Sequence, residues 1–180
     1  MVLTNSKPTI YLAGPVANVE DGGSQWRNEI VESYPNSDFN NPLDKYNAPA
    51  EDLTIVTKPA RGDTEVSHTE IVEGDKELLR ESNAVLIGYT DVLSTGTPME
   101  VMWAYERNYP IALWLRGGVN PSDLSPWYHY HVDNIVSHAG MAVDYLESIT
   151  ETVACEICGT ALGAGYLCDD CDTVEGWPDA

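Results

Sequence analysis

Apolar stretches alternate with amphipathic ones along the first 150 residues of the chain. Short strands are expected at 8–13, 37–40, 84–89, 109–115 and 132–137. Between them, apolar residues recur at helical spacing, which predicts helices over 25–34, 69–82, 98–107 and 138–150. Nearly continuous apolar strands that alternate with helices are typical of a parallel sheet covered on both faces. We therefore expect an α/β domain over residues 1–150.

A long irregular region, residues 41–67, interrupts this pattern. It contains several prolines and many polar residues, with one short apolar patch at Leu53–Val56. Loops of this length inside a compact domain are usually functional or mobile. A lid over a site and a surface insertion both agree with this composition.

The helix expected over 69–82 carries a carboxylate on its apolar face. That face is formed at helical spacing by Ile71, Asp75, Leu78, Leu79 and Ser82. A carboxylate among apolar residues is costly unless it is paired or functional. Asp75 is therefore a candidate functional residue, and the alternative is an edge position from which it reaches water.

A second candidate carboxylate, Glu100, follows the strand at 84–89. The chain turns through Ser94-Thr95-Gly96 and then opens a helix, for which Thr97 is a suitable N-cap. A strand, a glycine-containing turn and a helix N-terminus form a place where α/β proteins bind ligands. In the alternative interpretation, Thr97 and Glu100 form a capping box, and the carboxylate only accepts a backbone hydrogen bond.

The composition limits the partners of the chain. It has 29 Asp and Glu against 9 Lys and Arg, which gives a formal net charge of −20. Such a surface repels a phosphate backbone, so we expect no nucleic-acid partner. The acidic residues are spread along the chain, and this favours a halophilic protein that works where salt screens its self-repulsion.

No segment predicts export or membrane insertion. The N-terminal residues lack the apolar run of a signal peptide, and no window of about 18 residues is continuously apolar. All the cysteines follow residue 150, unlike those of a secreted disulfide framework. We expect a cytoplasmic protein without a membrane partner.

The cysteines form two Cys-x-x-Cys pairs separated by nine residues. The pairs are Cys155 with Cys158 and Cys168 with Cys171. Four thiolates in this arrangement suit tetrahedral zinc, and all four positions around the metal would be filled by protein. We therefore expect a structural zinc ribbon over residues 151–180, with two disulfides or iron as alternatives.

The histidines do not form a ligand pattern. His129 and His131 are expected on one face of this segment, with Tyr128 and Tyr130 on the other, which favours surface positions or satisfied polar packing. The sequence also lacks a nucleophilic-serine motif, a dinucleotide-binding glycine motif and a Walker A motif.

Asp75 and Glu100 remain as the candidate chemistry. Two carboxylates can share the cleavage of a glycosidic bond, one as nucleophile and the other as acid. A helix N-terminus would keep Glu100 ionised, which suits a nucleophile. An apolar face would raise the pKa of Asp75, which suits an acid.

Three motifs in this order resemble the nucleoside 2-deoxyribosyltransferase superfamily, which includes the 2'-deoxynucleoside 5'-monophosphate N-glycosidases. They are Tyr11-Leu-Ala-Gly-Pro15, Asp75-Lys-Glu-Leu-Leu with Ser82-Asn-Ala-Val-Leu-Ile87, and Ser94-Thr-Gly-Thr-Pro-Met-Glu100 with Ala104. The resemblance covers about residues 8–146. It implies a flavodoxin-like five-stranded parallel sheet with helices on both faces.

The resemblance also implies roles for individual residues. Glu100 would attack the anomeric carbon, Asp75 would protonate the departing base, and Tyr11 would orient Glu100 by a hydrogen bond. No cofactor would take part in catalysis. Family members are usually homo-oligomers in which a neighbour completes each site. The substrate-binding residues would be Gly14, Ser94, Gly96 and Ser125, the last of them in the site of a neighbouring subunit.

The chain departs from the family pattern at two places. Ser94 stands where nucleoside transferases carry Asp for the 5'-hydroxyl and nucleotide hydrolases carry Ser for the 5'-phosphate. A hydroxyl donates to phosphate, which favours a monophosphate, whereas the loop 14–23 lacks the expected arginine and the chain is very acidic. Transferases of the family often use their terminal residues to hold the base. In this chain, residues 151–180 follow at that point, so base recognition stays open.

We therefore predict an enzyme that cleaves or transfers at the N-glycosidic bond of a (2'-deoxy)ribonucleoside through a glycosyl–Glu100 intermediate. Hydrolysis of a nucleoside 5'-monophosphate to the free base is the alternative. A hypothesis of another class is a non-catalytic nucleotide-binding module that docks through its zinc ribbon.

Overall fold

The computed structural model describes residues 7–57, 62–149, 153–154 and 161–162. Its main sheet has five parallel strands in the order β2-β1-β5-β6-β7. The strands are β1 (Thr9–Ala13), β2 (Asp38–Asn40), β5 (Ala84–Tyr89), β6 (Ile111–Leu115) and β7 (Asn134–Val136). This is the flavodoxin-like 2-1-3-4-5 order, so the predicted α/β fold is confirmed.

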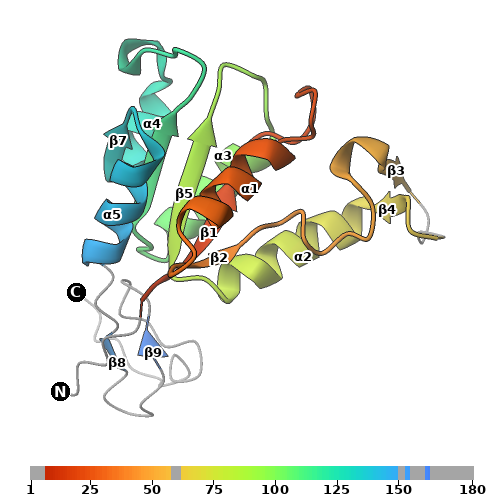
Figure 1. Ribbon diagram of the computed structural model, residues 1–180, viewed down its shortest axis with the longest axis horizontal. Coiled ribbons are helices and arrows are strands. Elements are labelled where there is room, and N and C mark those ends of the chain that lie inside the picture. The colour runs from red at the N-terminus through yellow and green to blue at the C-terminus, as the bar shows by residue number, and fades with distance from the viewer. Residues whose placement is uncertain (1–6, 58–61, 150–152, 155–160, 163–180) are drawn as a thin grey trace, which may run out of the picture.

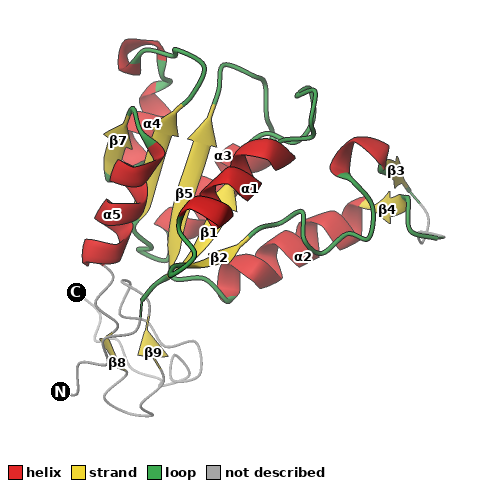
Figure 2. Cartoon of the chain, viewed as in Figure 1, coloured by secondary structure: helices red, strands yellow, loops and turns green. Residues whose placement is uncertain are grey.

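Helices cover both faces of this sheet (Figures 1 and 2). They are α1 (Ser24–Ser33), α2 (His68–Arg80), α3 (Gly96–Tyr105), α4 (Pro126–His131) and α5 (Ala139–Ile149). Helices α1 and α5 form one core with alternate strand residues such as Ile10, Leu12 and Leu86. The intervening residues, such as Tyr11, Val85 and Ile87, face α2 and α3. Two separate cores result because successive side chains of a strand point to opposite faces.

The centre of the sheet is the place where its strand order reverses. Strand β1 pairs with β2 on one side and with β5 on the other. The loops that follow β1 and β5 lie at the same edge of the sheet (Figure 1). In open α/β sheets this switch point is the usual ligand site.

The irregular region 41–67 contains short elements that the sequence pattern did not predict. They are the 3₁₀ turn η1 (Ala50–Asp52) and the strands β3 (Thr54–Val56) and β4 (Glu65–Ser67). Strands β3 and β4 pair in parallel and lie beside the start of α2, away from the main sheet (Figure 1). Three residues are too few to show a period of two, which explains why the pattern missed them. A second 3₁₀ turn, η2 (Pro121–Asp123), precedes α4.

Helix α3 begins two residues earlier than predicted, and the predicted capping box is wrong. Gly96 is its first residue, so Glu100 lies in the second turn. The N–H of Thr97 donates to Ser94 Oγ over 3.3 Å, and the hydroxyls of these two residues lie 2.9 Å apart. The carboxylate of Glu100 is therefore free of a capping role. A capping box does occur at the start of α2, between Ser67 and Glu70.

Helix α4 replaces the two-faced arrangement of His129 and His131 expected from the sequence. In the helix, His131 is buried and its Nδ1 lies 2.7 Å from the carbonyl oxygen of Trp127. His129 is exposed, and its Nε2 lies 3.0 Å from the carbonyl oxygen of Pro121. Both histidines have polar partners, as predicted, but they do not share one face.

The four cysteines lie outside the described residues. The nearest described elements, β8 (Val153–Ala154) and β9 (Ala161–Leu162), pair in antiparallel. The described part of the chain contains no group of three or more His, Cys, Asp or Glu that could hold a metal. The zinc ribbon and the 1–150 and 151–180 boundaries stay predictions.

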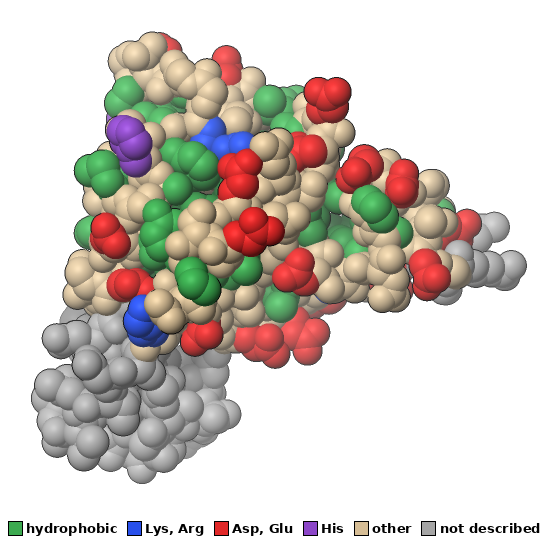
Figure 3. Space-filling view, viewed as in Figure 1, with side chains coloured by type: hydrophobic (Ala, Val, Ile, Leu, Met, Phe, Trp, Pro, Cys, Tyr) green, Lys and Arg blue, Asp and Glu red, His purple; other side chains and the backbone are tan. Residues whose placement is uncertain are grey.

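Acidic side chains are spread over the face of the molecule in Figure 3, whereas Lys and Arg occupy few points. Among the described helices, none has the length and apolar character needed to cross a membrane.

Candidate functional site

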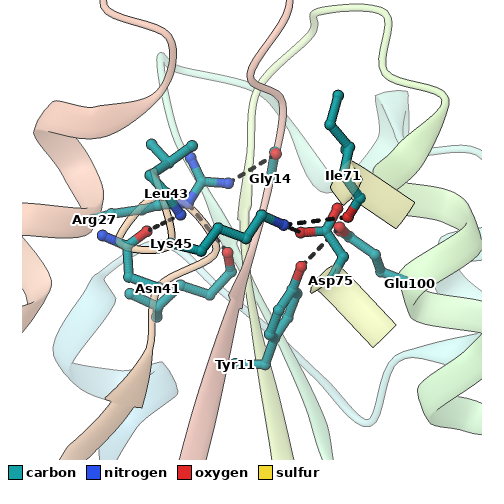
Figure 4. A network of polar contacts seen from close by, with 10 residues as sticks. Tyr11, Gly14, Arg27, Asn41, Leu43, Lys45, Ile71, Asp75 and Glu100 are labelled. Carbon is teal, nitrogen blue, oxygen red and sulfur yellow. Dashed lines mark hydrogen bonds and ion pairs between the residues drawn. The ribbon is translucent and has the colours of Figure 1, made fainter. Parts of the chain in front are cut away.

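Tyr11 and Glu100 meet on the α2/α3 face of the sheet. Tyr11 lies at the middle of β1 and is fully buried. Its hydroxyl donates a 2.9 Å hydrogen bond to Oε1 of Glu100 (Figure 4). The other carboxylate oxygen, Oε2, is buried and has no hydrogen-bond partner among the described residues. Glu100 thus has one oxygen held by a hydrogen bond and a second, buried oxygen without one.

Asp75 approaches the same point from α2. Its Oδ1 forms an ion pair with Nζ of Lys45, which comes from the region 41–67 (Figure 4). The Asp75 side chain is 21% exposed, which is enough for access from solvent but too little for full hydration. The structure therefore brings Tyr11, Asp75 and Glu100 together from three elements far apart in the sequence.

The pKa values of the two carboxyls are both raised. Burial, followed by the charge of Asp75, raises the pKa of Glu100 to about 7. Burial also raises the pKa of Asp75, and its hydrogen bond and ion pair with Lys45 oppose that increase. Burial raises the pKa of Tyr11 far above its ordinary value, so its hydroxyl stays protonated and donates.

These directions agree with one sequence expectation and differ from the other. The raised pKa of Asp75 was expected from its place on an apolar face. Glu100 was expected to be held ionised by the helix dipole, but burial outweighs that effect. The dipole acts mainly within the first turn of a helix, and Glu100 lies in the second turn of α3.

Arg27 is a buried charge that the sequence pattern did not reveal. Its guanidinium donates to the carbonyl oxygens of Leu12, Gly14 and Gly23 at 3.1, 2.8 and 2.7 Å. Its positive charge lowers the pKa values of Glu100 and Asp75. An arginine in an amphipathic helix usually indicates the solvent-facing side, and only the fold places this one under the loop after β1.

Gly14 has a packing role in this arrangement. A Cβ at this position would lie 2.9 Å from Trp26 and 3.1 Å from the carbonyl oxygen of Gly88. Its own carbonyl oxygen accepts from Arg27. The structure therefore explains a glycine here by close packing, and its predicted contact with substrate stays a prediction.

A cavity of about 310 Å³ lies at the carboxyl ends of β1 and β5, and the residues that line it do not include Tyr11, Asp75 or Glu100. Ser94, Thr97 and Tyr128 are among the residues that line it. The charge of Glu100 contributes to the raised pKa of Tyr128, although burial is its main cause, so the cavity wall lies within electrostatic reach of the carboxylate. Of the predicted substrate-binding residues, Ser94 is the one placed on this wall.

Gly96 and Ser125 lie at the surface. Gly96 is exposed, and a Cβ there would meet no atom within 4 Å. Ser125 is exposed and caps α4, since its Oγ accepts from the N–H of Trp127 over 3.3 Å. Neither placement assigns a contact with substrate, and both roles stay predictions.

The comparisons with known proteins identify the fold. No protein-family model matches the chain, and no curated protein matches it. A structure of 2-deoxyribosyltransferase from the psychrotolerant bacterium Bacillus psychrosaccharolyticus is 16% identical, with a TM-score of 0.53, and covers 77% of this chain and 90% of its own. A conserved protein from Enterococcus faecalis V583 is 17% identical, with a TM-score of 0.53, and covers 79% of this chain and 99% of its own. Likeness at this level of identity shows that the chain shares the fold of these two proteins.

Proposed function

We propose that this chain cleaves the N-glycosidic bond of a (2'-deoxy)ribonucleoside or its 5'-monophosphate, as a member of the nucleoside 2-deoxyribosyltransferase superfamily. The observation that carries the proposal is the carboxyl of Glu100, with Oε1 held by Tyr11, Oε2 unpartnered and Asp75 beside it. A nucleotide-binding module needs neither an oriented nucleophile nor a second carboxyl next to it.

In the first half of the proposed reaction, a carboxylate oxygen of Glu100 forms a bond to C1' of the sugar. The bond from C1' to the base nitrogen breaks, and its electron pair leaves with the base. Asp75, in its protonated form, gives that base a proton and becomes a carboxylate. The hydrogen bond from Tyr11 orients Glu100 for this attack and lowers its pKa, which favours the reactive anion.

The second half of the reaction decides between transfer and hydrolysis. When a second base attacks C1', the bond to Glu100 breaks and a new nucleoside forms. When water attacks, the free sugar forms instead. In either case, Asp75 recovers its proton from the attacking molecule. We favour transfer, and keep hydrolysis of a monophosphate as the second candidate because Ser94 lines the cavity.

The proton must lie on Asp75 and be absent from Glu100 for the first step. Both pKa values are raised in the empty site, and that of Glu100 reaches about 7. The pair therefore titrates together, and the active form has one proton in total. We expect a bell-shaped dependence of kcat/KM on pH.

The decisive experiment is incubation with a panel of nucleosides and 5'-monophosphates, with and without an acceptor base, at low and molar salt. A new nucleoside indicates a transferase, and free base alone indicates a hydrolase. Binding without turnover of any substrate would refute catalysis and support the nucleotide-binding module. Highest activity at molar salt is expected if the acidic surface reflects a halophilic protein.

A matched pair of variants tests the nucleophile. Glu100→Gln removes the reactive oxygen anion, and we expect at least about a 10³-fold loss of kcat. Glu106→Gln makes the same change at the exposed end of α3 and is expected to keep activity. Full turnover in Glu100→Gln would eliminate the covalent mechanism.

The proposal also includes a homo-oligomeric assembly and a structural zinc ribbon. Exposed aromatic side chains on α4, Trp127 at 69% and Tyr130 at 72%, support a homo-oligomer built through this helix.

The zinc ribbon would stabilise the segment after residue 150 or form a contact. Metal analysis of protein purified without chelators is expected to find about one zinc per chain, and none in a Cys155→Ser, Cys158→Ser variant.

A further inference from the structure

Lys45, which pairs with the candidate acid Asp75, follows a turn that hydrogen bonds of Asn41 hold in place. Asn41 is buried, its Oδ1 accepts from the N–H of Leu43 over 3.1 Å, and its Nδ2 donates to Asp44 Oδ1 over 2.7 Å. The N–H of Asp44 also donates to the carbonyl oxygen of Asn41 over 3.1 Å. These bonds define the path of the chain immediately before Lys45.

The side chain of Lys45 packs closely against Gly74 of helix α2. A Cβ at Gly74 would lie 3.1 Å from Cδ and 3.3 Å from Nζ of Lys45, which is closer than ordinary contact. The ammonium donates to the carbonyl oxygen of Ile71 over 3.2 Å and pairs with Asp75. Its side chain is 19% exposed. Lys45 is therefore held by close packing at Gly74, by a carbonyl oxygen and by a carboxylate.

We propose that Lys45 is a positioning residue that keeps Asp75 ionised in the empty site and must withdraw before Asp75 can act as an acid. The proposal rests on the function proposed above, in which Asp75 protonates the departing base. It also favours a lid over a surface insertion as the role of region 41–57, because Lys45 ties this region to the reacting groups.

The physical basis is a competition for one carboxyl. An ammonium at Oδ1 stabilises the carboxylate and loses this attraction when Asp75 is protonated. A base that requires a proton from Asp75 therefore competes with Lys45, and binding of the base is linked to release of the turn. The pair is largely shielded from water, so salt screens it less than a surface pair.

The other groups that face Asp75 do not replace Lys45. Arg27 lowers the pKa of Asp75, but its guanidinium is bonded to backbone carbonyls at the opposite side of β1. Tyr11 and Tyr46 are neutral, since burial raises the pKa of both. Glu100 disfavours a second negative charge beside it, since the charge of Asp75 raises its pKa. Lys45 is thus the cation placed directly on Asp75 among the described residues.

The first test does not depend on enzymatic activity. The carboxyl of Asp75 is titrated by ¹³C NMR in protein labelled at aspartate, with its signal identified by loss in Asp75→Asn. In Lys45→Met, we expect the midpoint of Asp75 to rise by about one to three pH units, a 10- to 1000-fold change in the protonation equilibrium. Lys45→Arg keeps the charge and is expected to retain most of the wild-type midpoint.

Lys76→Met is the matched control. Lys76 neighbours Asp75 in α2, but its ammonium is 3.0 Å from Glu73 and its side chain is 40% exposed. The Lys76→Met variant loses the same charge as Lys45→Met, so an equal rise of the Asp75 midpoint in these two variants would overturn a specific role for Lys45. An unchanged midpoint in Lys45→Met would also overturn it. If Lys45→Met does not fold, Lys45→Gln provides the neutral side chain.

The second test uses the pH dependence of kcat/KM. Loss of Lys45 is expected to move the pH profile of kcat/KM to higher pH, in the same direction as the NMR midpoint, because the ammonium lowers the pKa values of both carboxyls. If no substrate of the panel is turned over, the proposed function fails. The NMR midpoint of Asp75 still shows whether Lys45 stabilises its carboxylate. If turnover occurs but neither the pH profile nor the midpoint moves in Lys45→Met, the function stands and the role of Lys45 fails.

Discussion

The hydroxyl of Tyr11, at the centre of β1, donates a 2.9 Å hydrogen bond to Oε1 of Glu100 in α3. The two residues are 89 positions apart in the chain, and their contact joins the middle of the sheet to the helix that covers it. A buried tyrosine that stays protonated is a fixed donor, so the carboxylate does not have to reorganise when a substrate binds.

Tyr11→Phe removes this donor without changing the shape of the ring. We expect kcat to fall about 10²- to 10³-fold, because the carboxylate loses its orientation. The hydroxyl of Tyr11 also lowers the pKa values of Glu100 and Asp75, so its loss should move the pH profile of kcat/KM to higher pH. Steady-state kinetics across pH measure both effects. Tyr145→Phe, on α5 at the other face of the sheet, is the control, and an equal loss in both variants would contradict the role of Tyr11.

Glu100 is expected to cost the protein stability above neutral pH. Its pKa is raised from 4.5 to about 7 in the folded state, so between these values the folded chain holds a proton that the unfolded chain releases. The free energy of unfolding therefore falls as the pH rises through this range. Glu100→Gln should remove this fall and be more stable at pH 8 by on the order of 3 kcal/mol, with little difference near pH 4.

Chemical denaturation at several pH values measures this difference. Glu106→Gln serves again as the control, since its side chain is exposed at the end of α3. A Glu100→Gln variant that is less stable than the wild type at pH 8 would contradict the unfavourable burial of this carboxylate.

Arg27 is expected to support both the fold and the charge of the site. Arg27→Met leaves three backbone carbonyls without their donor and removes a buried positive charge, which should lower the free energy of unfolding by about 3–5 kcal/mol. The remaining folded protein should show higher pKa values for Glu100 and Asp75, because the charge of Arg27 lowers both. Arg80→Met, at an exposed position of α2, is expected to stay within about 0.5 kcal/mol of the wild type.

Ser94 is expected to control whether a 5'-phosphate is accepted. Ser94→Asp places a negative charge on the cavity wall, so kcat/KM for monophosphates should fall about 10- to 100-fold relative to that for nucleosides. Competition between a nucleoside and its monophosphate in one assay measures this ratio directly. Ser122→Asp adds the same charge at an exposed position, and a similar change of the ratio there would point to overall charge instead of Ser94.

The hydrophobic pattern of the sequence predicts the five strands of the main sheet and helices α1, α2, α3 and α5 in their observed order, but it misses helix α4 between β6 and β7. Periodicity and apolar runs are local properties, so strand β5 and the positions of α2 and α5 could be predicted within about two residues. The same local patterns singled out Asp75 and Glu100, because a carboxylate beside an apolar face or a strand end is visible without a fold.

The contacts and protonation of these groups depend on the folded chain. Lys45 and Arg27 have no distinguishing pattern, and their roles depend on contacts with residues far away in the chain. The hydroxyl of Ser94 accepts from the N–H of Thr97 at the start of α3, and the short strands β3 and β4 pair with each other. Burial of Glu100 raises its pKa against the expectation from the helix dipole. Burial and long-range pairing arise when distant segments pack together, and no local pattern records them.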